Sequence, residues 1–136
     1  MKGREFPGVA RDLCSGPGEA HWRAAAVHAY YALLLEGRDA LVRWGFTVPP
    51  RQQVHAYVRL RFTYATNLDV KQLGDVLDDL VQFRNRASYD LRLTAAFANN
   101  TRGRVAFQDA TDAVALLDAM EADPVRRAAA IASIQP

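Results

Sequence analysis

The stretch from Leu68 to Ser88 reads LDVKQLGDVLDDLVQFRNRAS and carries the clearest structural pattern in the sequence. Its apolar residues recur every three or four positions, and those on one side of a helical wheel are Leu73, Val76, Leu77, Leu80, Val81 and Phe83. The polar residues on the opposite side are Lys71, Asp75, Asp78 and Gln82. This period is that of an amphipathic α-helix, so we predict a core helix from about 68 to 88.

Two further helical patterns precede this stretch. The first runs from about Glu19 to Trp44, a length of ~40 Å at the helical rise per residue, with Gly37 as a position where it can bend. The second runs from about Arg51 to Ala65, directly after two prolines. Residues 58–62 of this second segment also alternate between apolar and charged residues, so a strand is the alternative interpretation there.

The C-terminal part of the chain predicts one long and one short helix. Apolar residues recur at helical spacing from about Val105 to Ala122, after a turn indicated by two asparagines and Gly103. Asp123 and Pro124 form a typical cap and first residue of a short fifth helix. We therefore predict an all-α fold, a bundle of four to five helices in a single domain over residues 1–136.

Composition restricts the class of protein. The chain has 136 residues, and its 17 Lys and Arg against 15 Asp and Glu leave a net charge of +2, too small for a generally basic nucleic-acid surface. The single cysteine, Cys14, cannot form a disulfide within the chain. No apolar run has the length of a membrane span or follows the pattern of a secretion signal. We expect a cytoplasmic protein without membrane contact, metal site or cofactor.

An arginine interrupts the apolar face of the helix at 68–88. At 100° per residue, Arg84 projects within about 20° of Leu73 and Leu77. A guanidinium directed at an apolar face must be paired, hydrogen-bonded or open to a cleft, because burial of an unpaired charge is costly. One interpretation is that the face leaves the core near the helix end and Arg84 extends to water. The other is a polar cleft around Arg84.

Other polar groups are placed to complete such a cleft. On the same helix and at its end these are Asn85, Ser88 and Tyr89, with Asp90 following. On the helix at 19–44 they are His28, Tyr30 and Tyr31. A single histidine or tyrosine in a helical pattern is more often a core residue than a functional one, so these side chains are candidates only in combination with Arg84.

Two short motifs occur in a particular order. Ala29-Tyr30-Tyr31-Ala32 lies on the first long helix, and Arg84-Asn85-Arg86-Ala87-Ser88-Tyr89-Asp90 lies at the end of a later one. Together they resemble the HEPN superfamily, whose closest subgroup has an A-Y-Y-A segment, a histidine after the first helix and an R-x-x-A-D-Y-like segment. The counterpart of that histidine is His55. The resemblance extends from about Phe6 to Ala122.

The resemblance implies a four- or five-helix bundle that forms a homodimer, with the arginine segments in a cleft near the dimer axis. It also implies a nucleotidyltransferase partner in a toxin–antitoxin or phage-defence module. Active members are metal-independent ribonucleases with an R-x4-6-H motif, in which arginine stabilises the phosphate and histidine transfers a proton. The wide apolar face of the helix at 19–44 is a second reason to expect a symmetric homodimer.

This sequence departs from the ribonuclease motif, because Arg84 is followed by Tyr89 where the motif has histidine. Tyrosine is a poor proton shuttle at neutral pH. Our first hypothesis is therefore a catalytically degenerate protein that binds RNA, a nucleotide or a partner protein through Arg84. The second is an active endoribonuclease that uses Arg84 with His28 or Tyr89. The third is a structural interaction module in which Arg84 belongs to a buried pair.

Overall fold

A computed structural model describes residues 2–92 and 94–136 of the chain. Within these residues the fold consists of six α-helices and two 3₁₀ turns, with no strand. The helices are α1 (Phe6–Cys14), α2 (Glu19–Arg43), α3 (Gln53–Thr63), α4 (Leu68–Tyr89), α5 (Thr101–Ala122) and α6 (Pro124–Ser133). The 3₁₀ turns are η1 (Gly3–Glu5) and η2 (Ala95–Phe97). The predicted all-α bundle is confirmed, with one helix more than the four or five expected.

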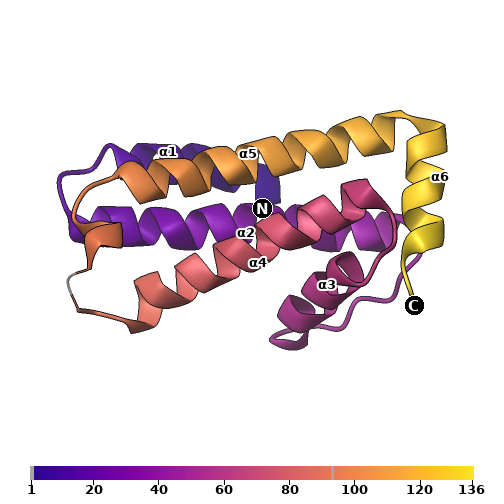
Figure 1. The fold of residues 1–136 in the computed structure, drawn as a ribbon, viewed down its shortest axis with the longest axis horizontal. Helices are drawn as coiled ribbons and strands as arrows, with labels where there is room; N and C mark the ends of the chain where they lie inside the picture. The colour runs from indigo at the N-terminus through magenta and orange to yellow at the C-terminus, as the bar shows by residue number, and fades with distance from the viewer. Residues whose placement is uncertain (1, 93) are drawn as a thin grey trace.

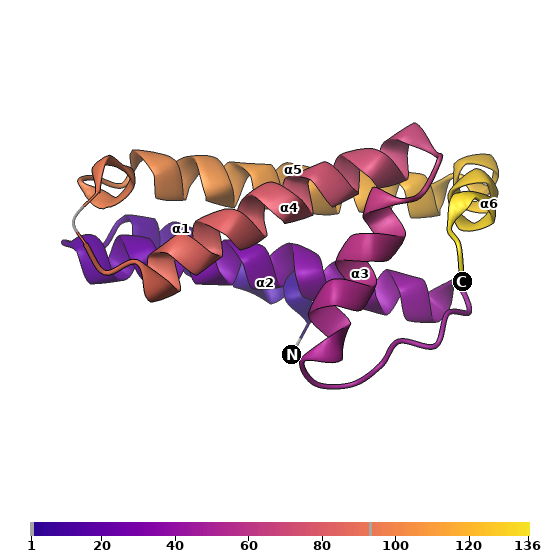
Figure 2. The ribbon, with the colours of Figure 1, turned by 60° about the horizontal axis from the view of Figure 1, so that its bottom comes forward.

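The three long helices α2, α4 and α5 run along the length of the bundle (Figure 1). The helix α1 lies beside α2 and α5, and α3 packs against α4 and α2. The last helix, α6, crosses the end of the bundle, as both views show (Figure 2). None of the described helices combines the length and the apolar character that crossing a membrane requires. This arrangement leaves α4 with α2 and α3 on one side and α5 on another.

The core lies along α2, whose apolar face is covered by other helices of the same chain. The buried apolar residues of α2 are Ala25, Ala26, Ala29, Tyr30, Ala32, Leu33, Leu34, Ala40 and Leu41. Small alanines let α1, α4 and α5 approach this helix closely. Because the chain covers this face itself, the face does not support the expected homodimer. That prediction now depends on the resemblance alone.

Helix ends follow the local sequence. Asn67 Oδ1 accepts a hydrogen bond from the Val70 amide (3.2 Å) at the start of α4. The predicted cap at Asp123 is confirmed, since its Oδ1 accepts from the amides of Val125 (3.0 Å) and Arg126 (3.3 Å). The start of α5 was predicted too late. It begins at Thr101, and Gly103 lies within the helix rather than in a turn.

Three glycines allow close helix contacts. A Cβ on Gly103 would lie 3.2 Å from Cys14 Sγ of α1. A Cβ on Gly37 of α2 would lie 2.8 Å from the Phe62 ring, and one on Gly74 of α4 would lie 2.9 Å from the Phe62 carbonyl carbon. Gly37 and Gly74 therefore make room for the end of α3, and α2 continues through Gly37 as one helix. The alternative of a strand at 58–62 is wrong, because these residues belong to α3.

Candidate functional site

Arg84 is half-buried on α4, on the side that faces α2 and α3. Its Nη1 donates to Asn85 Oδ1 at 3.0 Å, and its Nη2 lies 3.5 Å from the Tyr31 hydroxyl, at the outer limit for a hydrogen bond. The buried Nε has no hydrogen-bond partner in residues 2–92 and 94–136. Within the same residues, none of the ion pairs includes Arg84. Its charge is therefore only weakly compensated.

Tyrosine rings surround this guanidinium. The Arg84 Cζ lies 5.6 Å from the ring centroid of Tyr30 and 5.9 Å from those of Tyr31 and Tyr89. These distances are within the range of cation–π attraction, which partly offsets the cost of removing the charge from water. Tyr30 is fully buried, whereas Tyr89 is 75% exposed. Of the rings around Arg84, Tyr30 thus lies in the core and Tyr89 lies open to solvent.

His55 of α3 joins this site through Tyr30. The Tyr30 hydroxyl and His55 Nδ1 are 2.6 Å apart, and the two rings stack with their centroids 5.7 Å apart. Burial raises the pKa of Tyr30 to about 12, although Arg84 acts in the opposite direction. Burial and then the charge of Arg84 lower the pKa of His55 below its usual range. At neutral pH the phenol keeps its proton and the imidazole is uncharged.

A cleft of about 440 Å³ opens between α2, α3 and α4 at this point. Its polar lining includes Arg84, Asn85, His55, Gln52 and Arg59. Asp78 also lines the cleft, and its carboxylate is 3.9 Å from the guanidinium of Arg59. This ion pair leaves Arg84 as the cation of the cleft without a carboxylate within ion-pair distance among the described residues.

The structure separates two of the candidate residues from the rest. His28 Nδ1 is 2.8 Å from the Ala24 carbonyl oxygen, and its ring packs against Phe6 with a centroid distance of 5.6 Å. No hydrogen bond joins His28 with Arg84 in the described part of the chain. Ser88 is exposed and does not line the cleft.

Sequence reasoning missed several residues of the cleft, among them Gln52, Arg59 and Asp78, and underrated His55. Gln52 and Arg59 were not candidates, because nothing in their local pattern distinguishes them from solvent-exposed residues of α3. His55 entered through the resemblance and not as a site residue. The signal that was available was the spacing of Gln52, His55 and Arg59, which places all three on one face of the predicted helix.

Comparisons with known proteins do not assign this cleft, since no family model, curated protein or solved structure matches the chain. Within the described residues, no group of three or more His, Cys, Asp or Glu side chains has the arrangement of a metal site. The functional interpretation therefore depends on the chemistry of the cleft and on the motif resemblance.

Proposed function

We propose that the protein is a catalytically degenerate HEPN-like protein that binds a phosphate of RNA or of a nucleotide in the cleft around Arg84. The observation that carries the proposal is the state of Arg84, half-buried and without a carboxylate partner among the described residues. A positive charge in such surroundings retains a strong attraction for an anion. A phosphate group supplies both the charge and the acceptor oxygens that the guanidinium lacks.

The surrounding side chains favour a nucleotide over inorganic phosphate. The exposed ring of Tyr89 lies beside the Arg84 guanidinium, and a nucleobase next to the bound phosphate can stack on it. Gln52 and Asn85 add amide groups that can bond with ribose or base atoms. The polar lining thus offers contacts to a base and a sugar as well as to a phosphate.

The hydrogen bond between Tyr30 and His55 supports binding rather than cleavage when Tyr30 is its donor. The Tyr30 phenol, with a pKa of about 12, keeps its proton, and we assign its hydroxyl as the donor to His55 Nδ1, the tautomer of His55 setting this direction. The imidazole proton is left on Nε2, so neither ring nitrogen has a free lone pair to take a proton from a ribose hydroxyl. In this tautomer His55 serves as a hydrogen-bond donor and not as a general base.

A metal-independent endoribonuclease is the second candidate, because His55 and Arg84 line the same cleft. In that case His55 must carry its proton on Nδ1 and donate it to the Tyr30 hydroxyl oxygen, which leaves the Nε2 lone pair free to act as the base, or the hydrogen bond between the two residues must break. His55 takes the acid–base role in this version, since His55 lines the cleft together with Arg84 and His28 does not. From the resemblance we also continue to predict a homodimer, a nucleotidyltransferase partner and a role in a toxin–antitoxin or defence module.

The test is titration of a short single-stranded RNA against the wild type and Arg84→Met. Methionine keeps an unbranched side chain that reaches about as far as the arginine Nε, and it removes the charge. We expect at least about a tenfold loss of affinity and a decrease of about 0.7 in the slope of log affinity against log salt, the effect of one lost phosphate contact. The matched control is Arg127→Met on α6, at the end of the bundle. Equal losses for both variants would reject a specific role for Arg84.

The same RNA distinguishes binding from cleavage. If the protein is catalytically degenerate, prolonged incubation leaves the RNA intact in the absence of metal. Cleavage that His55→Gln abolishes would replace the binding proposal by the endoribonuclease. Binding without cleavage supports the first proposal.

A further inference from the structure

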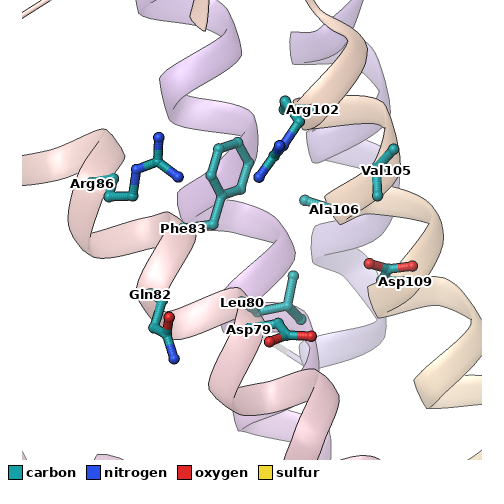
Figure 3. Close-up of a pocket in the computed structure, with 9 residues that line it drawn as sticks. All are labelled: Asp79, Leu80, Gln82, Phe83, Arg86, Arg102, Val105, Ala106 and Asp109. Atoms are coloured by element: carbon teal, nitrogen blue, oxygen red, sulfur yellow. The ribbon is translucent and has the colours of Figure 1, made fainter. Parts of the chain in front are cut away.

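A second groove lies on another side of α4, between α4 and α5, with a volume of about 530 Å³ (Figure 3). Its floor is formed by the nearly fully buried side chains of Leu80, Phe83 and Ala106. Phe83 stacks on Phe97 with parallel rings 5.2 Å apart, and this stacking holds its position in the floor. Arg84 and Arg86 differ by two residues, or about 200° around the helix, so they belong to different grooves.

Charged side chains occupy the two ends of this groove. Arg86 of α4 and Arg102 of α5 lie at one end on either side of Phe83, and Asp79 and Asp109 lie at the other (Figure 3). On each helix the arginine and the aspartate are seven residues apart, so the two ends are separated by about 10 Å along the helix axes. The groove therefore has a cationic end, an apolar middle and an anionic end.

Like charges face each other at both ends, although opposite charges would stabilise the helix pair. None of these four side chains takes part in an ion pair or a side-chain hydrogen bond with the described residues. Burial raises the pKa of Asp109, and the carboxylates of Asp112 and Asp79 raise it further. Solvent screens much of this repulsion because the four side chains are exposed, and a ligand with matching charges would relieve the remainder.

We propose that this groove binds an elongated phosphate ester that carries a protonated amine about 10 Å from its phosphate. Arg86 and Arg102 hold the phosphate, since two guanidinium groups supply paired donors for its oxygens. Asp79 and Asp109 hold the amine. The chain between the two groups lies over Phe83 and Leu80. A volume of about 530 Å³ fits a small molecule of this kind.

The proposal does not depend on the Arg84 cleft, because it concerns different residues on another side of α4. Its probe is 6-aminohexyl phosphate, whose extended length matches the distance between the two ends of the groove. The comparison compounds are hexyl phosphate, which lacks the amine, 2-aminoethyl phosphate, which is too short, and inorganic phosphate. Affinity is measured by calorimetry, and the site is located by the amide shifts of Phe83 and Ala106 in NMR spectra.

We expect 6-aminohexyl phosphate to bind about tenfold more tightly than each comparison compound, because only it reaches both charged ends. Arg102→Gln should weaken its binding about tenfold, whereas the matched Arg104→Gln on the same helix should not. Asp109→Asn should lower its affinity toward that of hexyl phosphate, with Asp79 left to hold the amine, and Asp75→Asn on α4 should not. All four positions are exposed, so these variants are expected to fold.

Equal affinities for 6-aminohexyl phosphate and hexyl phosphate would overturn the proposal, as would binding without shifts at Phe83 and Ala106. Equal losses in the Arg102 and Arg104 variants would also overturn it, since they would show attraction to general positive charge. RNA affinity is measured on Arg102→Gln in parallel. An unchanged RNA affinity with a lost ligand affinity would support two separate sites.

Discussion

Arg23 and Arg84 are both withdrawn from water, but their surroundings differ. Arg23 is 8% exposed, and its Nη1 and Nη2 donate to the carbonyl oxygens of Arg86, Ala87, Asp90 and Arg92. Its Nε donates to Glu19 at 2.8 Å, and its Cζ lies 4.2 Å from the Phe97 ring centroid. Arg23 therefore caps the C-terminal end of α4 from a neighbouring helix, where the carbonyls carry partial negative charge.

Arg84 also lies near aromatic rings, but among the described residues it has neither a carboxylate nor the carbonyls of a helix end as partners. Its only hydrogen bonds in the described residues are to Asn85 and, at 3.5 Å, to Tyr31, and its Nε is without a partner there. An arginine whose three nitrogens all donate hydrogen bonds to the protein stabilises the fold, whereas a half-buried arginine beside a cleft, with an Nε unpaired among the described residues, is available to a ligand. The predictions below test this distinction.

The largest effect is expected for Arg23→Met. Removal of the guanidinium leaves the carbonyls at the end of α4 without these donors and Glu19 without its partner, so we expect a loss of about 3 kcal/mol in the free energy of unfolding. Urea denaturation measures this loss. Arg84→Met serves as the comparison, with a loss below about 1 kcal/mol. Equal losses would remove the distinction between the two arginines.

Glu19→Gln separates the contribution of the carboxylate partner of Arg23 from that of the carbonyls at the end of α4. We expect a loss of about 1 kcal/mol or less, because the carboxylate is partly exposed and Arg23 keeps its four carbonyl acceptors. The same denaturation experiment gives the value. A loss as large as that of Arg23→Met would show that the carboxylate, and not the end of α4, is the important partner.

His55 reports the charge of Arg84 directly. Burial and Arg84 hold the pKa of His55 below its usual value of 6.5, so the unfolded chain takes up this proton first as the pH falls. The contribution of His55 to the free energy of unfolding is fully present above pH 6.5 and is lost as the pH falls through the pKa of His55 in the folded chain. Arg84→Met should raise the pKa of His55 in an NMR titration and reduce this pH dependence. An unchanged pKa would place the Arg84 charge away from His55.

A bound phosphate should also change the pKa of His55. A phosphate beside Arg84 compensates its positive charge, so saturating RNA should raise the pKa of His55 in the wild type. In Arg84→Met the same RNA concentration should leave the pKa nearly unchanged. A larger response in the variant would contradict phosphate binding at Arg84.

The smallest effect concerns carboxylates with and without partners. Glu36 is 3% exposed, and although burial raises its pKa, hydrogen bonds from Arg4 lower it below the usual range. Asp109 has a raised pKa and no such partner in the described residues, so its ionisation opposes folding. The loss of folding stability from ionised Asp109 is absent at a pH below its unfolded pKa of 3.8 and is complete at a pH above its folded pKa. Stability should therefore rise as the pH falls through that window.

Asp109 is exposed and solvent screens the repulsion from its neighbours, so Asp109→Asn should increase the free energy of unfolding by no more than about 0.5 kcal/mol at pH 7 and leave it unchanged at pH 3. Asp75→Asn is the control and should have a smaller effect. Destabilisation by Asp109→Asn at pH 7 would show that the carboxylate has a stabilising partner.

The helices that could be predicted from the sequence are those with a long apolar period. The stretch 68–88 was predicted almost to its ends because one face is apolar and the other charged. The helix α1 was missed because Phe6–Cys14 is short and begins with Pro7 and Gly8, which usually indicate a turn. Pro7 is acceptable there only because it lies in the first turn of the helix.

Polar residues, too, could be predicted only where the signal lies within one helix. Arg84 was found because it interrupts an apolar stripe on its own helix, a local signal. The role of Arg23 was not predictable, because its partners are backbone carbonyls more than sixty residues away along the chain. The hydrogen bond between Tyr30 and His55 was missed for the same reason, since it depends on how α3 packs against α2.

The most direct test measures two quantities on one variant, the RNA affinity and the free energy of unfolding of Arg84→Met. If Arg84 is available to a ligand, affinity falls at least about tenfold while the free energy of unfolding changes by less than about 1 kcal/mol. A loss of about 3 kcal/mol or more would place Arg84 with Arg23 as a structural residue. A stable variant with unchanged RNA affinity would contradict the phosphate site and leave the structural interaction module as the remaining interpretation.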